Sequence, residues 1–200
     1  EKKINYEIER DTIILDTIFI KKNLTVNNTI KFDNKVVLIE DGVKIIFKNK
    51  SKFIFNSSKI EFNGFKRNNI ILIGGENNSM LFNKCDVKFK NVSVVGFGNF
   101  TDDMISLPSA ITFYNSNVEI QNSLFENNLS GDDFINLYNS TFRIENSNFN
   151  YSLSDAVDSD FSKGDIINSS FTEIGNDALD FSGSSVVVKN CNFKYVQDKA

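Results

Sequence analysis

The sequence predicts an all-β protein, a right-handed single-stranded parallel β-helix with about 22 residues per coil and roughly seven to eight coils. Three observations predict this fold. A 22-residue repeat runs through the C-terminal half, apolar residues alternate at period two within each repeat, and no segment keeps the helical period of 3.6. Propellers and β-sandwiches are the alternatives, but they rely on hairpin turns such as Asn-Gly and Asp-Gly, which are scarce here.

The repeat is clearest near the C-terminus. Residues 177–180 (DALD) align with 155–158 (DAVD) and 133–136 (DFIN) when the chain is shifted back by 22 positions each time. The same frame fits residues 110–125 and 79–94 with looser spacing, because an insertion at 96–108 separates these two repeats. Equivalent positions of successive coils are therefore expected to stack about 4.8 Å apart.

Each repeat is expected to hold three short strands. In the last repeat the first strand contains Leu179 and Phe181, which point inward, and a Gly/Ser/Asn turn follows. The second strand contains the inward residues Val186 and Val188. A tight turn and a third short strand, which ends the coil, complete the repeat.

Two columns of equivalent residues have structural explanations. The first is an asparagine ladder at the tight turn, where Asn tolerates a left-handed backbone and stacked amides can bond to one another. It comprises Asn91, Asn122, Asn146, Asn168 and Asn190. The second is expected to form an inward stack, with an outward aromatic platform for a ligand as the alternative. It comprises Val94, Phe125, Phe149, Phe171 and Phe193.

The chain is expected to divide into two parts. Residues 1–30 are interpreted as an N-terminal cap with the first strands, and residues 31–200 as the β-helix, with regular coils from about residue 109 and truncation at the C-terminus. Cys85 and Cys191 fall in different columns four repeats apart, roughly 20 Å, so no disulfide is expected. Open coil ends would allow self-association.

Stacked aspartates are the candidate functional residues. Asp155, Asp158, Asp177 and Asp180 recur in neighbouring coils. One interpretation is that the first Asp of each strand caps a turn by accepting backbone N–H bonds. A second is a calcium site built from carboxylates of successive coils, and a third is a carboxylate pair for glycoside chemistry. Arg143 and Lys163 are candidate bases, although Asp165 in the same column as Arg143 suits a surface ion pair.

Composition excludes several function classes. The net charge of −4 and the pI near 5.0 disfavour a nucleic-acid partner. No apolar run is long enough for a membrane span. The absence of His rules out the usual zinc spacings, and neither a phosphate-binding glycine loop nor a nucleophile elbow is present. The sequence assigns no catalytic residues, and calcium is the one cofactor that it suggests.

The repeats DAVDSDFSKGDIINSSF and NDALDFSGSSVVVKNCNF resemble those of the pectate-lyase-like superfamily, including its NosD-type group, and the β-helix regions of bacterial proteins related to the spore-coat H type. The resemblance covers roughly residues 53–200. It implies a parallel β-helix and binding of polysaccharides, but this chain lacks the His-bearing motifs of the polygalacturonases and epimerases.

The leading functional prediction is a non-catalytic scaffold of a bacterial extracellular or surface protein, which presents a carbohydrate- or protein-binding face. A calcium-dependent polysaccharide lyase or hydrolase, and a carbohydrate-binding protein like a phage tailspike, are the alternatives. The first residues, EKKINYEIER, lack the apolar segment of a signal peptide. Secretion is still compatible with the sequence, because a mature or truncated chain would lack that segment too.

Overall fold

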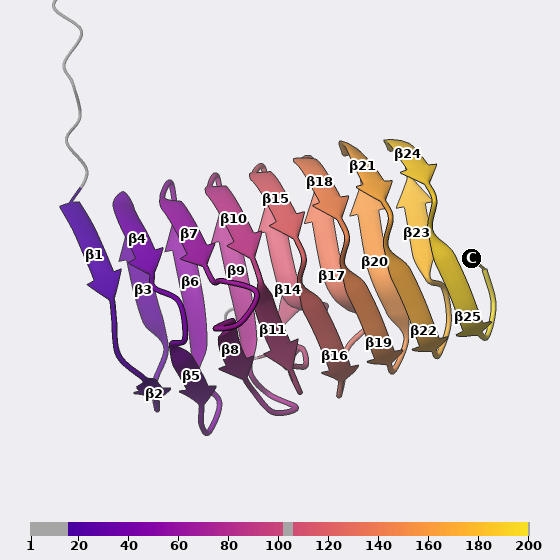
Figure 1. Ribbon diagram of the computed structural model, residues 1–200. Helices are drawn as coiled ribbons and strands as arrows, with labels where there is room; N and C mark the ends of the chain where they lie inside the picture. The colour runs from indigo at the N-terminus through magenta and orange to yellow at the C-terminus, as the bar shows by residue number, and fades with distance from the viewer. Residues whose placement is uncertain (1–15, 102–105, 200) are drawn as a thin grey trace, which may run out of the picture.

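The computed structural model describes residues 16–101 and 106–199, without the side chains of Phe100 and Thr101. The chain winds as a parallel β-solenoid of about eight turns with roughly 23 residues per turn (Figure 1). Every strand except those of one small hairpin pairs in parallel with the equivalent strand of the next coil. The predicted all-β parallel β-helix is therefore confirmed. No helix long and apolar enough to cross a membrane occurs in the described residues.

Three long sheets run along the solenoid. Sheet A contains β1 (Asp16–Ile20), β4 (Lys35–Ile39), β7 (Lys59–Asn63), β10 (Asp86–Lys90), β15 (Asn117–Gln121), β18 (Thr141–Glu145), β21 (Lys163–Ile167) and β24 (Ser185–Lys189). Sheet B contains β2 (Leu24–Val26), β5 (Lys44–Phe47), β8 (Ile70–Ile73), β11 (Val92–Val95), β16 (Leu124–Asn128), β19 (Asn148–Ser152), β22 (Ser170–Ile174) and β25 (Asn192–Val196).

Sheet C contains β3 (Ile30–Asp33), β6 (Lys52–Asn56), β9 (Ser79–Asn83), β14 (Ser109–Tyr114), β17 (Asp133–Tyr138), β20 (Asp155–Asp160) and β23 (Leu179–Ser182). The hairpin of β12 (Phe100–Thr101) and β13 (Ser106–Leu107) lies in the predicted insertion. β1 and β2 fall within the segment predicted as a cap and already pair with the next coil, whereas residues 1–15 lie outside the described part of the chain.

The register agrees with the predicted repeat in the last coils. Asp133 pairs with Asp155, and Asp158 with Asp180, each 22 residues further along the chain. Earlier coils vary in length, because Asp16 pairs with Lys35, 19 residues further along, whereas Met80 pairs with Ile111 across the insertion, 31 residues further along. The core lies inside this stack of coils. In the predicted inward column, the rings of Phe125, Phe149, Phe171 and Phe193 stack with centroids 4.9, 4.9 and 5.2 Å apart.

Corners between strands use residues with a left-handed backbone. The five asparagines of the ladder, at the corner between sheets A and B, have φ values of 50 to 53°. Within the described residues, one hydrogen bond joins side-chain amides along this column, from Asn190 Nδ2 to Asn168 Oδ1 at 3.3 Å. A further left-handed column, unforeseen from the sequence, lies near the end of sheet B. It comprises Asn127, Tyr151, Glu173 and Tyr195. For side chains other than Gly and Asn, this conformation costs about 1–3 kcal/mol each.

Serine hydroxyls follow two of these corners and bond the coils together. In the ladder between sheets A and B, Ser147 Oγ accepts the Ser123 N–H at 3.2 Å and donates to the Glu145 carbonyl at 2.9 Å. The corner between sheets C and A repeats this arrangement with Ser116, Ser140, Ser162 and Ser184. Cys85 occupies this second ladder, and Cys191 occupies the first; both are free thiols.

Candidate functional site

The outward face of sheet C, from β14 to β23, brings together the polar and aromatic residues of the C-terminal coils. Alternation along each strand gives this face two columns, because every second side chain points away from the core. The first column is Thr112, Asn136, Asp158 and Asp180, of which Thr112 and Asn136 are buried and the two aspartates are half-buried. The second is Tyr114, Tyr138, Asp160 and Ser182. The strand register therefore places residues that are distant in the sequence next to one another in one continuous strip.

Carboxylates at the entrance of sheet C bond to the backbone of the following coil. Asp155 Oδ1 accepts the Asp177 N–H at 2.9 Å and the Asn176 Nδ2–H at 2.7 Å. Asp177 Oδ1 in turn accepts the Lys199 N–H at 2.8 Å, and Lys199 Nζ lies 3.3 Å from its other oxygen. The capping role expected for these acids thus has a geometric basis, although the N–H groups belong to the next coil rather than to the acid's own turn.

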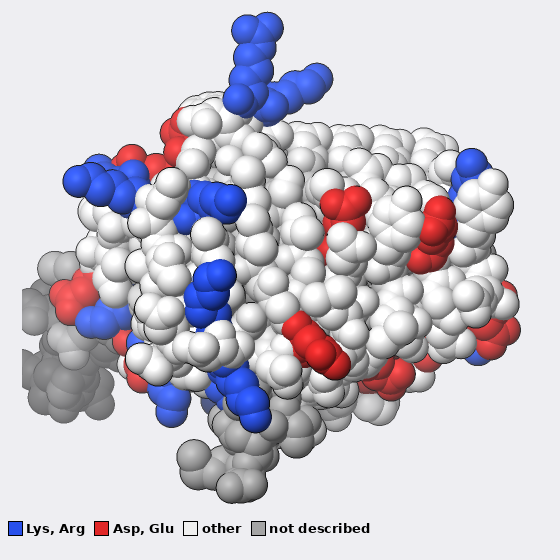
Figure 2. Space-filling model, turned by 90° about the horizontal axis from the view of Figure 1, so that it is seen from below, with Lys and Arg blue, Asp and Glu red and all other residues white. Residues whose placement is uncertain are grey.

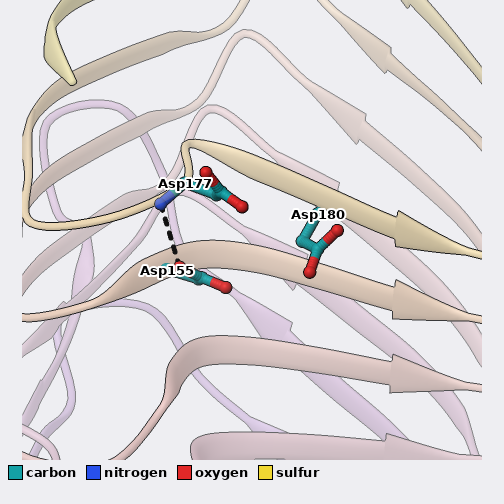
Figure 3. A group of neighbouring side chains, drawn as sticks. All are labelled: Asp155, Asp177 and Asp180. Carbon is teal, nitrogen blue, oxygen red and sulfur yellow. Dashed lines mark hydrogen bonds between the residues drawn. The ribbon is translucent and has the colours of Figure 1, made fainter. Parts of the chain in front are cut away.

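Three of the four candidate ligands lie together. Carboxylate oxygens of Asp155, Asp177 and Asp180 come within 4.8 Å of one another (Figure 3). Asp158 stays outside this group, and its Oδ2 accepts a hydrogen bond from Asn136 Nδ2 at 2.7 Å. Oxygen atoms in this arrangement suit a hard cation such as Ca²⁺. Two of the three carboxylates, however, already accept protein N–H groups.

Asp133 is the most perturbed acid of the face. The residue is 3% exposed. Burial, followed by the charge of Asp158, raises the pKa of Asp133 to about 8. Burial, followed by the charges of Asp160 and Asp180, raises the pKa of Asp158 to about 6. The sequence places Asp133 in the acidic column, yet nothing in the sequence distinguishes it from Asp155 and Asp177.

An exposed aromatic stack adjoins the acids. The rings of Tyr114 and Tyr138 lie parallel with centroids 5.2 Å apart, and Phe161 meets Tyr138 edge-on at 5.7 Å. These rings are 42%, 36% and 62% exposed. This stack was not predicted from the sequence, although the aligned segments 113–116 (FYNS) and 137–140 (LYNS) place two tyrosines at equivalent positions.

The candidate bases lie on another face. Arg143 and Lys163 belong to β18 and β21 of sheet A. Arg143 Nη1 contacts Asp165 at 3.2 Å, and Nη2 contacts Glu145 at 3.3 Å, so this arginine forms surface ion pairs as its column suggested. Neither residue shares the outward face of sheet C with the acids.

Comparison with known proteins adds little to this geometry. No family model matches the chain, and no curated protein does. Among solved structures, the chain is similar to QnrB1, a plasmid-mediated fluoroquinolone resistance protein, with 10% identity and a TM-score of 0.24 over 85% of this chain and 91% of that one. A likeness this weak supports no functional argument, and the solenoid itself rests on the strand pairing.

Proposed function

We propose that the protein is a non-catalytic β-helix scaffold whose sheet C face binds a polysaccharide. The observation that carries this proposal is the exposed Tyr114–Tyr138 stack beside the outward carboxylates of β20 and β23. The exposed edges and hydroxyl groups of the stacked tyrosines form an apolar strip with polar tips against which sugar rings can pack, while the Asp carboxylates accept hydrogen bonds from sugar hydroxyls.

The repeat of the fold suits a long ligand. Equivalent side chains recur about every 4.8 Å along the axis, so a glycan laid across the coils meets polar groups at each step. The acids favour a neutral or amino-sugar polymer, because stacked carboxylates repel a polyuronate in the absence of a cation. The finer assignment, a pectate-lyase-like module of a bacterial extracellular or surface protein, rests on the resemblance of the repeats and belongs to this proposal.

Affinity electrophoresis through gels that contain neutral, amino-sugar and uronate polysaccharides tests the proposal. We expect at least one neutral or amino-sugar polymer to retard the protein. Tyr138→Ala should abolish the retardation, since it removes the central ring of the platform. Tyr195→Ala, which removes an exposed tyrosine on sheet B, is the matched control and should migrate like the wild type. Retardation by no polymer, or equal loss in both variants, would refute the proposal.

A calcium-dependent lyase or hydrolase is a second candidate, and the Asp155–Asp177–Asp180 group favours it. Incubation with uronate polysaccharides, with and without calcium, separates the two candidates. The scaffold proposal predicts neither unsaturated product by ultraviolet absorbance nor new reducing ends. Calcium-dependent cleavage that disappears in Asp180→Asn would establish the enzyme instead.

A further inference from the structure

A second candidate site lies at the ends of strands β19, β22 and β25, on sheet B. A groove of about 780 Å³ opens there. Tyr151, Glu173 and Tyr195 line it from equivalent positions of three successive coils. Leu153, which is 61% exposed, and Val196 also line it. The strands of sheet B end on the lower side of Figure 1, the side from which Figure 2 is viewed.

The three polar and aromatic side chains of the groove project from strained backbone. Their φ values are 55°, 57° and 56°, although the equivalent position in β16 is Asn127, a residue type that tolerates this conformation. The chain therefore has a lower-strain solution for this corner and uses it one coil earlier. Such strain often accompanies a functional role. Ser57, Lys84 and Phe161 share it at the corner between sheets C and A, but among the described residues the groove column is where three such residues follow in successive coils.

The geometry suits a positively charged ligand. Tyr151 and Tyr195 both line the groove and are separated by two coil steps, a backbone spacing of about 10 Å. A cation is attracted by an aromatic ring when it lies within about 6 Å of the ring centroid. Glu173 projects from the intervening coil and is the one charged residue among those that line the groove. The Tyr195 ring already has an ammonium group on it, since Lys194 Nζ lies 4.7 Å from its centroid.

The charge distribution also favours a positively charged ligand. Residues 106–199 contain 13 Asp and Glu against 5 Lys and Arg, whereas residues 16–101 contain 7 against 14. On the face seen in Figure 2, Lys and Arg gather over the N-terminal coils, and acidic residues are the main charges over the C-terminal coils. Cations are consequently attracted to the half of the solenoid that holds the groove.

We propose that this groove binds an organic ammonium ion, and a quaternary ammonium in preference to a primary one. Apolar walls formed by the tyrosine rings, Leu153 and Val196 suit methyl substituents. Glu173 is the one carboxylate in the lining, so a primary ammonium would direct its other N–H donors to the neutral side chains of Asn128, Ser152 and Gln197, whereas methyl groups pack on the apolar walls. The site is independent of the polysaccharide face on sheet C.

Titration of the wild-type protein with choline, methylammonium and 3,3-dimethylbutan-1-ol, followed through the tyrosine ring signals by NMR, tests the proposal. The alcohol is the neutral isostere of choline and controls for shape. We expect choline to bind at least about 10-fold more tightly than either competitor, because a charge-dependent gain of about 1.4 kcal/mol corresponds to that factor. Equal binding of the alcohol, tighter binding of methylammonium, or no binding of choline would overturn the proposal.

Variants locate the site and test the role of strain. Glu173→Gln and Tyr195→Leu should each weaken choline binding about 10-fold, while Tyr114→Leu on sheet C should leave it unchanged. Tyr151→Asn should lose choline binding and raise the melting temperature by about 2–4 °C, because Asn relieves the left-handed strain. Wild-type binding in the groove variants, or a lower melting temperature in Tyr151→Asn, would contradict the inference.

Discussion

Replacement of Asp133 by Asn should make the stability of this protein less dependent on pH. In the folded state Asp133 keeps its proton up to a pKa of about 8, whereas its ordinary value is 3.8. Between these values the folded chain binds more protons than the unfolded chain, so stability falls as pH rises. The slope is about 1.4 kcal/mol per pH unit, hence about 3 kcal/mol between pH 5 and pH 7.

The assay is urea unfolding of wild type and Asp133→Asn across that pH range. The near-isosteric amide carries no titratable proton, so its stability advantage should grow by about 3 kcal/mol between pH 5 and pH 7. Asp158→Asn provides the control, because it removes the charge that contributes most after burial and should flatten part of the wild-type slope. A constant difference between wild type and Asp133→Asn, or a less stable variant at pH 7, would refute the reasoning.

Other substitutions test the scaffold. Ser147→Ala should lower the free energy of unfolding by about 1–3 kcal/mol in chemical denaturation, because it leaves the buried Ser123 N–H without its acceptor. Ser154→Ala, at a half-buried site whose hydrogen bonds are both 3.5 Å long, should change little. Phe149→Ala should cost about 3–5 kcal/mol by the same measurement, and a loss below 1 kcal/mol would contradict the continuous inward stack. Arg143→Gln should cost less than about 1 kcal/mol in thermal unfolding, since both of its ion pairs are exposed.

The repeat was sufficient to predict which residues stack in the C-terminal coils. Alternating apolar residues and a fixed spacing of 22 leave one register in which the column of Phe125, Phe149, Phe171 and Phe193 points inward. Before residue 109 the insertion breaks this spacing, and coil boundaries there depend on loop geometry that no local pattern encodes. The aspartate columns were predicted for the same reason, whereas the side-chain direction that separates Asp158 from the other three was not.

The outward-facing features of the solenoid are harder to predict from the sequence than its core. Tyr114 and Tyr138 occupy positions that the alternation marks only as exposed, so their mutual stacking follows from register combined with side-chain conformation. The left-handed backbone at Tyr151 and Tyr195 contradicts residue preference, and propensity therefore could not reveal it. Asn-Ser pairs repeat visibly along the chain, yet the serine ladder was overlooked because the asparagine alone explained the corner.

Hydroxyl-radical footprinting with a bound polysaccharide tests the central claim most directly. The protein is oxidised with and without saturating amounts of the polymer that retards it most, and modified peptides are quantified by mass spectrometry. The proposed function predicts protection at Tyr114, Tyr138 and Phe161, with Tyr195 oxidised equally in both samples. Protection at Tyr195 alone, or undiminished oxidation of the sheet C aromatics while polymer is bound, would show that the polysaccharide binds elsewhere.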